Sequence, residues 1–112
     1  MEAQPLTWSS DSNFRLWRYG VGHSQLSIRS FGGETGEMIE ILFEGVERVD
    51  LNRQYHGLQV SIGYASHGVP QHLEVLISGS SGTGSVTCSR ATIRRLRESD
   101  SSEIELLVSV HV

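Results

Sequence analysis

Histidine and carboxylate side chains are the groups in this sequence whose spacing most suggests chemistry. The tightest group is His67, His72 and Glu74 in the segment HGVPQHLE. If a strand begins at residue 72, His72 and Glu74 share a face, and His67 lies in the loop before it. A metal site needs three or four converging donors, and this spacing matches no zinc motif. The three residues are therefore candidate ligands of an alternative function, a small-ligand or metal-binding β-barrel, and otherwise are loop and surface side chains.

Other reactive groups do not assemble into a catalytic set. Cys88 is in phase with Val86 on an expected strand, which suits a small core residue. The loop from Gly79 to Gly84 lacks the Lys and Ser/Thr of a phosphate-binding loop. Glu40 and Glu44 are four residues apart on a strand, about 13 Å, which is too far to share a proton. The sequence predicts a protein that is not an enzyme and has no cofactor.

Exposed aromatic side chains are the better indication of function. Phe14 to Tyr19 reads as a strand with Phe14 inward, so that alternation turns Trp17 and Tyr19 outward together. An exposed Trp and Tyr on a strand are typical of protein-binding hot spots. The alternative is that a second sheet covers this face as well. Arg29 is the third partner-binding candidate, and it can also pair with a carboxylate on a neighbouring strand, such as Glu40.

Charge limits the partners that we expect. The formal net charge is −4, which argues against a sequence-independent grip on nucleic acid and leans weakly towards basic partners. The arginines between residues 90 and 97 either face a partner or guard an edge strand, and the acidic residues that follow offset them.

Length and cysteine content indicate one intracellular domain. A chain of 112 residues suits a single domain, and its one cysteine allows no internal disulfide. The N-terminus lacks the features of a signal peptide, and no apolar run approaches the ~20 residues of a membrane helix. We therefore expect a cytoplasmic protein with no membrane contact.

Alternation of apolar and polar residues with period two runs through nearly the whole sequence. It predicts strands at 14–19, 25–31, 37–51 with a bulge at Gly45, 58–64, 72–78 and 104–112. Residues 91–98 are either a strand with a bulge, which we favour, or a short helix. With no helix to cover a sheet, the expected fold is all-β and mainly antiparallel. It is a small β-sandwich or partly open barrel of about seven strands, with at most one short helix. Residues 1–12 are expected to form a flexible arm, and residues 13–112 a single β domain.

Three segments also carry a resemblance. They are the aromatic run at 14–19, the segment at 23–30 and the strand at 39–46. Together they resemble a group of small, uncharacterised bacterial β proteins, often actinobacterial, that are similar to immunity proteins in size and style. The resemblance implies a bacterial cytoplasmic β protein and carries no catalytic residues.

These observations predict a non-enzymatic protein-binding module, immunity-like, that uses Trp17, Tyr19 and Arg29. The expected partner is another protein, either a toxin or a second copy of the chain. A dimer through the edge strand 104–112 is one form that self-association can take.

Overall fold

The computed structural model describes residues 6–20, 24–33, 35–64 and 72–112, and within them every regular element is a β-strand. No helix in this part of the chain is long and apolar enough to cross a membrane. The strands are β1 (Leu6–Gly20), β2 (Gln25–Phe31), β3 (Glu37–Glu44), β4 (Arg48–Asp50), β5 (Gln54–Tyr64), β6 (Leu73–Gly79), β7 (Gly82–Cys88), β8 (Arg90–Arg97) and β9 (Glu103–His111).

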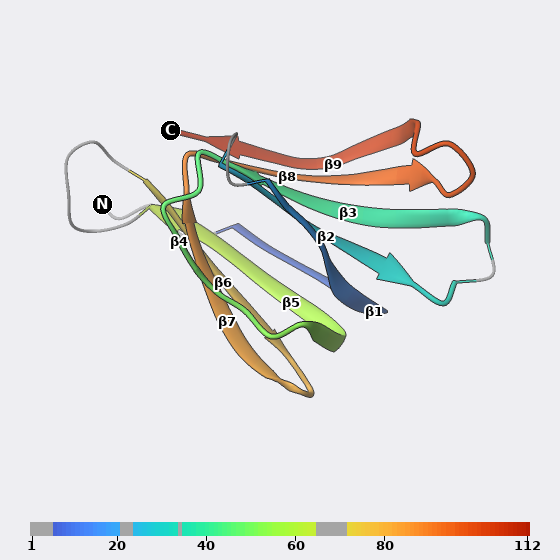
Figure 1. Cartoon of the computed structure of the whole chain (residues 1–112), viewed down its shortest axis with the longest axis horizontal. Helices are drawn as coiled ribbons and strands as arrows, with labels where there is room; N and C mark the ends of the chain where they lie inside the picture. The colour runs from blue at the N-terminus through green and yellow to red at the C-terminus, as the bar shows by residue number, and fades with distance from the viewer. Residues whose placement is uncertain (1–5, 21–23, 34, 65–71) are drawn as a thin grey trace.

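All nine strands belong to one antiparallel sheet in the order β4-β7-β6-β5-β1-β2-β3-β8-β9. The all-β, antiparallel prediction is confirmed, but the expected seven strands in a sandwich or barrel are wrong, because the sheet is single and open. Strands β4 and β9 are its two edges. Figure 1 shows that the group β4 to β7 runs in a different direction from the group β2, β3, β8 and β9. A strongly curved sheet can cover its own apolar face without a second sheet.

Strand β1 connects the two groups. Its first half, from Leu6, pairs with β5, and its second half pairs with β2, with a change of register between Ser10 and Asn13. Residues 6–12, expected in a flexible arm, are therefore part of a 15-residue strand. Residues 1–5 lie outside the described residues. The polar sequence of this segment concealed the strand because its side chains are mostly exposed, while its backbone forms the ladder.

The inner face of the curved sheet forms one core. Alternate apolar residues along β2, β3, β5, β6 and β8 are buried there. The sequence predicted this for β2, β3, β5 and β6 from their period of two. Trp8 from the first half of β1 meets Phe14 from its second half edge-to-face, with ring centroids 6.3 Å apart. Buried side chains from both groups of strands belong to the same cluster: Phe14, Leu26, Ile28, Ile41, Phe43, Tyr55, Leu58, Val60, Ile62, Leu73, Val75, Ile77, Val86, Cys88, Ala91 and Ile93.

The predicted strand 37–51 is two strands at distant positions. Gly45 ends β3 in a left-handed conformation, at φ +63°, and the chain crosses to form β4 at the far edge of the sheet. A Cβ at residue 45 would lie 2.5 Å from the Oγ of Ser89. Gly45 is therefore the point where the chain leaves β3, and the bulge expected there within one long strand is wrong.

The C-terminal hairpin settles the alternatives for residues 91–98, because Arg90–Arg97 is strand β8. Strand β9 is an edge, as expected, and its apolar residues are divided between the two faces of the sheet. Register shifts leave Ile104 and Leu107 as extra residues opposite β8, and Leu106 pairs with Arg94 while Val108 pairs with Ile93. Leu106 is consequently exposed and Val108 packs against the core.

Candidate functional site

Trp17 and Tyr19 lie on different faces of the sheet, contrary to the prediction. The register of β1 against β2 shifts between Leu16 and Arg18, so Trp17 is an extra residue in the ladder. Beyond this bulge Tyr19 pairs with the core residue Leu26, and directly opposed residues share a face. Both aromatic side chains are about half exposed, 50% for Trp17 and 49% for Tyr19. The two rings cannot act as one anchor pair, and Trp17 alone lies on the outer face.

Arg29 forms the cross-strand ion pair that the sequence predicted. Its Nε donates to the Oε2 of Glu40 at 2.7 Å, and the same oxygen accepts from the Ser27 hydroxyl at 3.1 Å. The other carboxylate oxygen, Oε1, accepts from Nη2 of Arg94 at 2.6 Å. Residues 29, 40 and 94 occupy matching positions on β2, β3 and β8, so the ladder itself brings them together. One carboxylate thus fixes two guanidinium groups.

Glu40 is only 3% exposed although it belongs to the outer face. Burial by itself would raise its pKa, but hydrogen bonds from Arg94, Arg29 and Ser27 outweigh that effect and hold the pKa below its ordinary value. The carboxyl group is therefore ionised at neutral pH. A charged group with both oxygens already bonded is a structural anchor and a poor proton donor or acceptor for a substrate.

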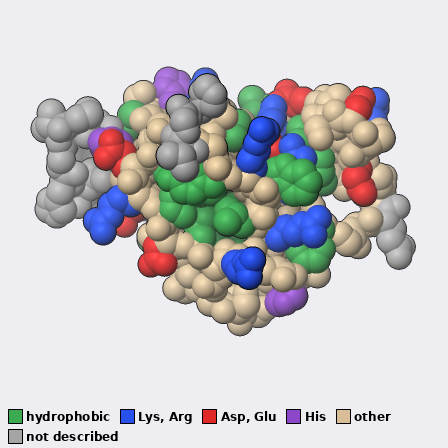
Figure 2. Space-filling model, in the orientation of Figure 1, with side chains coloured by type: hydrophobic (Ala, Val, Ile, Leu, Met, Phe, Trp, Pro, Cys, Tyr) green, Lys and Arg blue, Asp and Glu red, His purple; other side chains and the backbone are tan. Residues whose placement is uncertain are grey.

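Two arginines next to this ion pair contact aromatic rings. The guanidinium of Arg29 lies 4.8 Å from the centroid of the Trp17 ring, within the range of a cation–π contact. The guanidinium of Arg15 lies 5.9 Å from Trp17 and 5.1 Å from Phe31. We call these four residues, Arg15, Trp17, Arg29 and Phe31, the outer patch. Figure 2 shows arginine side chains beside hydrophobic ones on the right-hand half of the molecule, where β1 and β2 lie in Figure 1.

The outer patch borders a hollow of about 520 Å³. Ser30, Gly32 and Gly33 contribute to its lining from the end of β2. The carboxylates of Glu37 and Glu98 lie at the same hollow, so its charge is mixed. The hollow offers two aromatic rings, two arginines that contact them and nearby backbone, which is an arrangement for holding a partner group.

No protein-family model, curated protein or solved structure matches this chain.

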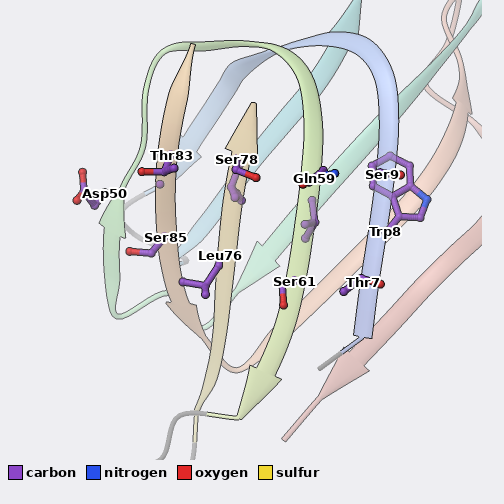
Figure 3. A pocket seen from close by; sticks show the side chains of 13 residues that line it. Thr7, Trp8, Ser9, Asp50, Gln59, Ser61, Leu76, Ser78, Thr83 and Ser85 are labelled. Atoms are coloured by element: carbon purple, nitrogen blue, oxygen red, sulfur yellow. The ribbon is translucent and has the colours of Figure 1, made fainter. Parts of the chain in front are cut away.

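A larger hollow, about 910 Å³, lies on the other half of the sheet. Figure 3 shows its side chains in two rows across the strands, Ser9, Gln59, Ser78 and Thr83 in one, and Thr7, Ser61, Leu76 and Ser85 in the other. Six of its thirteen lining residues carry a hydroxyl group, and Asp50 at one end is the acidic residue of its lining. This surface combines no titratable pair and no cation, so the outer patch is the stronger candidate site.

The candidate metal ligands are not gathered in the described part of the chain. His72 Nε2 lies 3.3 Å from Oε1 of Glu47, while Glu74 is an exposed residue within β6. His67 lies outside the described residues. Among the residues that the structure describes, no three His, Cys, Asp or Glu side chains form a group that could hold a metal ion.

Arg15, Phe31 and Arg94 are members of the site that sequence reasoning did not select. Arg15 and Arg94 occupy the same cross-strand row as the predicted pair Arg29–Glu40. Extending that row by one strand on either side would have found both, given the correct strand order. Phe31 could be recognised only from the register of β1 against β2, because that register places Phe31 beside Arg15.

Proposed function

We propose that this protein is a non-enzymatic binding module that holds another protein through the outer patch, with Trp17 as its main anchor. The observation that carries the proposal is the half-exposed Trp17 ring in contact with the Arg29 guanidinium, which Glu40 holds in place. Tryptophan and arginine are the residues most enriched in interface hot spots. A ring held in place before binding loses little conformational entropy when a partner covers it.

The ionised Glu40 supports binding over catalysis. Its two oxygens are occupied by Arg29, Arg94 and Ser27, so its role is to orient the cation beneath Trp17. Shape and rigidity are what a protein-binding surface needs, whereas acid–base catalysis needs a group free to exchange a proton.

A toxin is the partner class that we propose, with the protein acting as an immunity-like neutraliser in a bacterial cytoplasm. This part of the proposal rests on the sequence resemblance. The second copy expected at β9 is a less favoured partner, because the bulges at Ile104 and Leu107 interrupt a regular edge.

The decisive experiment compares two variants as bait in the organism that encodes the chain. Trp17→Ala removes the anchor, and Leu76→Ala removes an equally exposed apolar side chain, 50% against 50%, from the other half of the sheet. Quantitative mass spectrometry should find a protein retained by the wild type and by Leu76→Ala but lost with Trp17→Ala. Calorimetry with that purified protein should show Kd rising at least about 30-fold in Trp17→Ala.

Two results would contradict the proposal. One is a partner whose affinity is the same for the wild type and Trp17→Ala. The other is equal weakening by Trp17→Ala and Leu76→Ala, which would mean that the outer patch has no special role.

A further inference from the structure

We propose that Arg15 is the receptor for a carboxylate of the partner protein, so that the partner presents an Asp or Glu side chain to the outer patch. The inference rests on the proposed function and adds the chemistry of the group that is bound. It concerns an arginine that contacts aromatic rings but forms no ion pair within the described part of the chain.

One row of charged residues crosses four strands on the outer face. In the strand ladder Arg15 stands opposite Arg29, Arg29 opposite Glu40, and Glu40 opposite Arg94. The signs alternate along this row except at its first step, where two arginines stand directly opposite each other. Like charges in that position are destabilising, and a fold has no structural reason to keep them. Local conflicts of this kind are expected where a binding function requires them.

Glu40 does not compensate Arg15. Its oxygens accept from Arg29, Ser27 and Arg94, and Arg15 forms no ion pair with any residue that the structure describes. The guanidinium of Arg15 instead lies near the rings of Trp17 and Phe31. These rings limit its motion and exclude water on part of its surface, which strengthens a charge-assisted hydrogen bond. A carboxylate is planar and matches the guanidinium in two-point contact.

The surroundings favour a single carboxylate over a nucleic acid. Binding to nucleic acid requires several cations, each neutralising a phosphate. Here Arg29 and Arg94 are already paired with Glu40, and among the residues that the structure describes Arg15 is the cation of the row without an ion-pair partner. Glu37 and Glu98 line the same hollow and would repel a polyanion.

The test uses capped pentapeptides that differ at one atom group. Ac-Gly-Gln-Glu-Gln-Gly-NH₂ and its all-glutamine counterpart, with Gln in place of Glu, are titrated into ¹⁵N-labelled protein. The indole N–H resonance of Trp17 is followed, assigned with the Trp17→Phe variant. The glutamate peptide should shift that resonance saturably, and the glutamine peptide should not. Arg15→Gln should weaken binding about tenfold or more.

Arg48→Gln is the matched control, because it removes the same charge from β4 at the far edge of the sheet. It should bind the glutamate peptide as the wild type does. Equal shifts with both peptides, or unchanged binding in Arg15→Gln, would overturn the inference. Decathymidylate is the third probe, and binding to it that is tighter than to the glutamate peptide would also overturn it, by assigning the patch to nucleic acid.

A purified partner protein separates this inference from the proposed function. If Trp17→Ala abolishes partner binding and Arg15→Gln leaves it unchanged, the carboxylate receptor is wrong and the anchor stands. If both variants bind the partner normally, the proposed function fails as well.

Discussion

Glu40 is the residue on which the outer patch depends, because it holds Arg29 and Arg94 in place from a nearly inaccessible position. We expect Glu40→Gln to lower the free energy of unfolding by about 3 kcal/mol at pH 7, the lower end of the cost of breaking a buried ion pair. The lower end applies because the arginine partners keep contact with water, with side chains 17% and 30% exposed. Urea denaturation measures the difference.

The pH dependence of this contribution has a definite sign. The folded-state pKa of Glu40 is depressed, so its stabilisation is fully present above the unfolded-state pKa. It is lost as the pH falls through the folded-state pKa, when the carboxylate is protonated. The stabilities of wild type and Glu40→Gln should therefore converge in acid. A constant difference down to pH 2 would contradict this account.

Cys88 gives a prediction at the opposite end of the pH scale. Burial raises the pKa of its thiol from 9.0 to about 11. In the unfolded chain the thiol ionises first, so above pH 9 the folded state binds more protons and the stability falls as the pH rises. We expect a loss of stability between pH 9 and 11 that is smaller in Cys88→Ala, measured by urea denaturation across that range. Equal slopes for the two proteins would show that other groups cause the alkaline loss.

At the scale of the elements, the turn from β3 towards β4 depends on Gly45. Gly45→Ala would combine an unfavourable positive φ with a contact against Ser89. Gly32→Ala is the matched control, because Gly32 has a similar φ of +78° and nothing within 4 Å of the added Cβ. We expect about 1 kcal/mol for Gly32→Ala, and clearly more for Gly45→Ala, by thermal denaturation. Equal losses would mean that Ser89 moves aside freely.

The bulges of β9 are expected to limit self-association. Leu107 is an extra residue between Leu106 and Val108, which pair with consecutive residues of β8. Its deletion would keep both of those pairs and straighten the exposed edge. We expect the deletion variant to dimerise or aggregate at concentrations where the wild type does not, as seen by sedimentation velocity. A monomeric deletion variant with an intact fold would show that other features protect this edge.

These bulges also explain which parts of the fold could be predicted from the sequence. Alternation located β6 through Leu73, Val75 and Ile77, because apolar and polar residues alternate along a regular half-buried strand. The pair Arg29–Glu40 followed from neighbouring regular strands. A bulge leaves no such mark. The extra residue at Trp17 turned Tyr19 to the face opposite the predicted one, and the extra residue at Leu107 places Leu106 and Val108 on different faces.

Glycine in β7 concealed a strand for a different reason. Residues 79–84 were predicted to be a loop, yet β7 begins at Gly82. A Cβ at residue 84 would lie 2.5 Å from the Tyr55 hydroxyl and 2.6 Å from the Asp50 carbonyl. Gly84 is a strand residue at a close approach of the neighbouring chain, and the partners that impose this approach are distant in the sequence.

At the scale of the whole molecule, β1 makes the two groups of strands into one sheet, since it pairs with β5 through one half and with β2 through the other. Phe14 lies at the centre of this arrangement. It is fully buried, its backbone is paired on both sides with Tyr55 and Ser30, and its ring meets Trp8. The stability of each group therefore depends on the same residue.

This dependence predicts a single unfolding transition for both groups of strands. Trp17→Phe leaves Trp8 as the fluorescent reporter beside β5, and Trp8→Phe leaves Trp17 as the reporter beside β2. In urea, the emission change of each single-tryptophan protein should coincide with its own loss of circular dichroism. Different midpoints for fluorescence and circular dichroism would mean that one group unfolds while the other persists, and β1 would then be a linker.

Phe14→Ala, made in each single-tryptophan protein, tests through the free energy of unfolding whether the two groups of strands unfold together. Truncating a buried phenylalanine costs about 3–5 kcal/mol, a large part of the ~5–15 kcal/mol that stabilises a domain. Because Phe14 packs between both groups of strands, the loss in free energy of unfolding should be equal whether Trp8 or Trp17 reports it. Leu76→Ala, which removes an exposed side chain, should cost about 0.5 kcal/mol or less. If Phe14→Ala shifted only one reporter, the core would be two separate clusters, and the curvature of the sheet would not be the source of its stability.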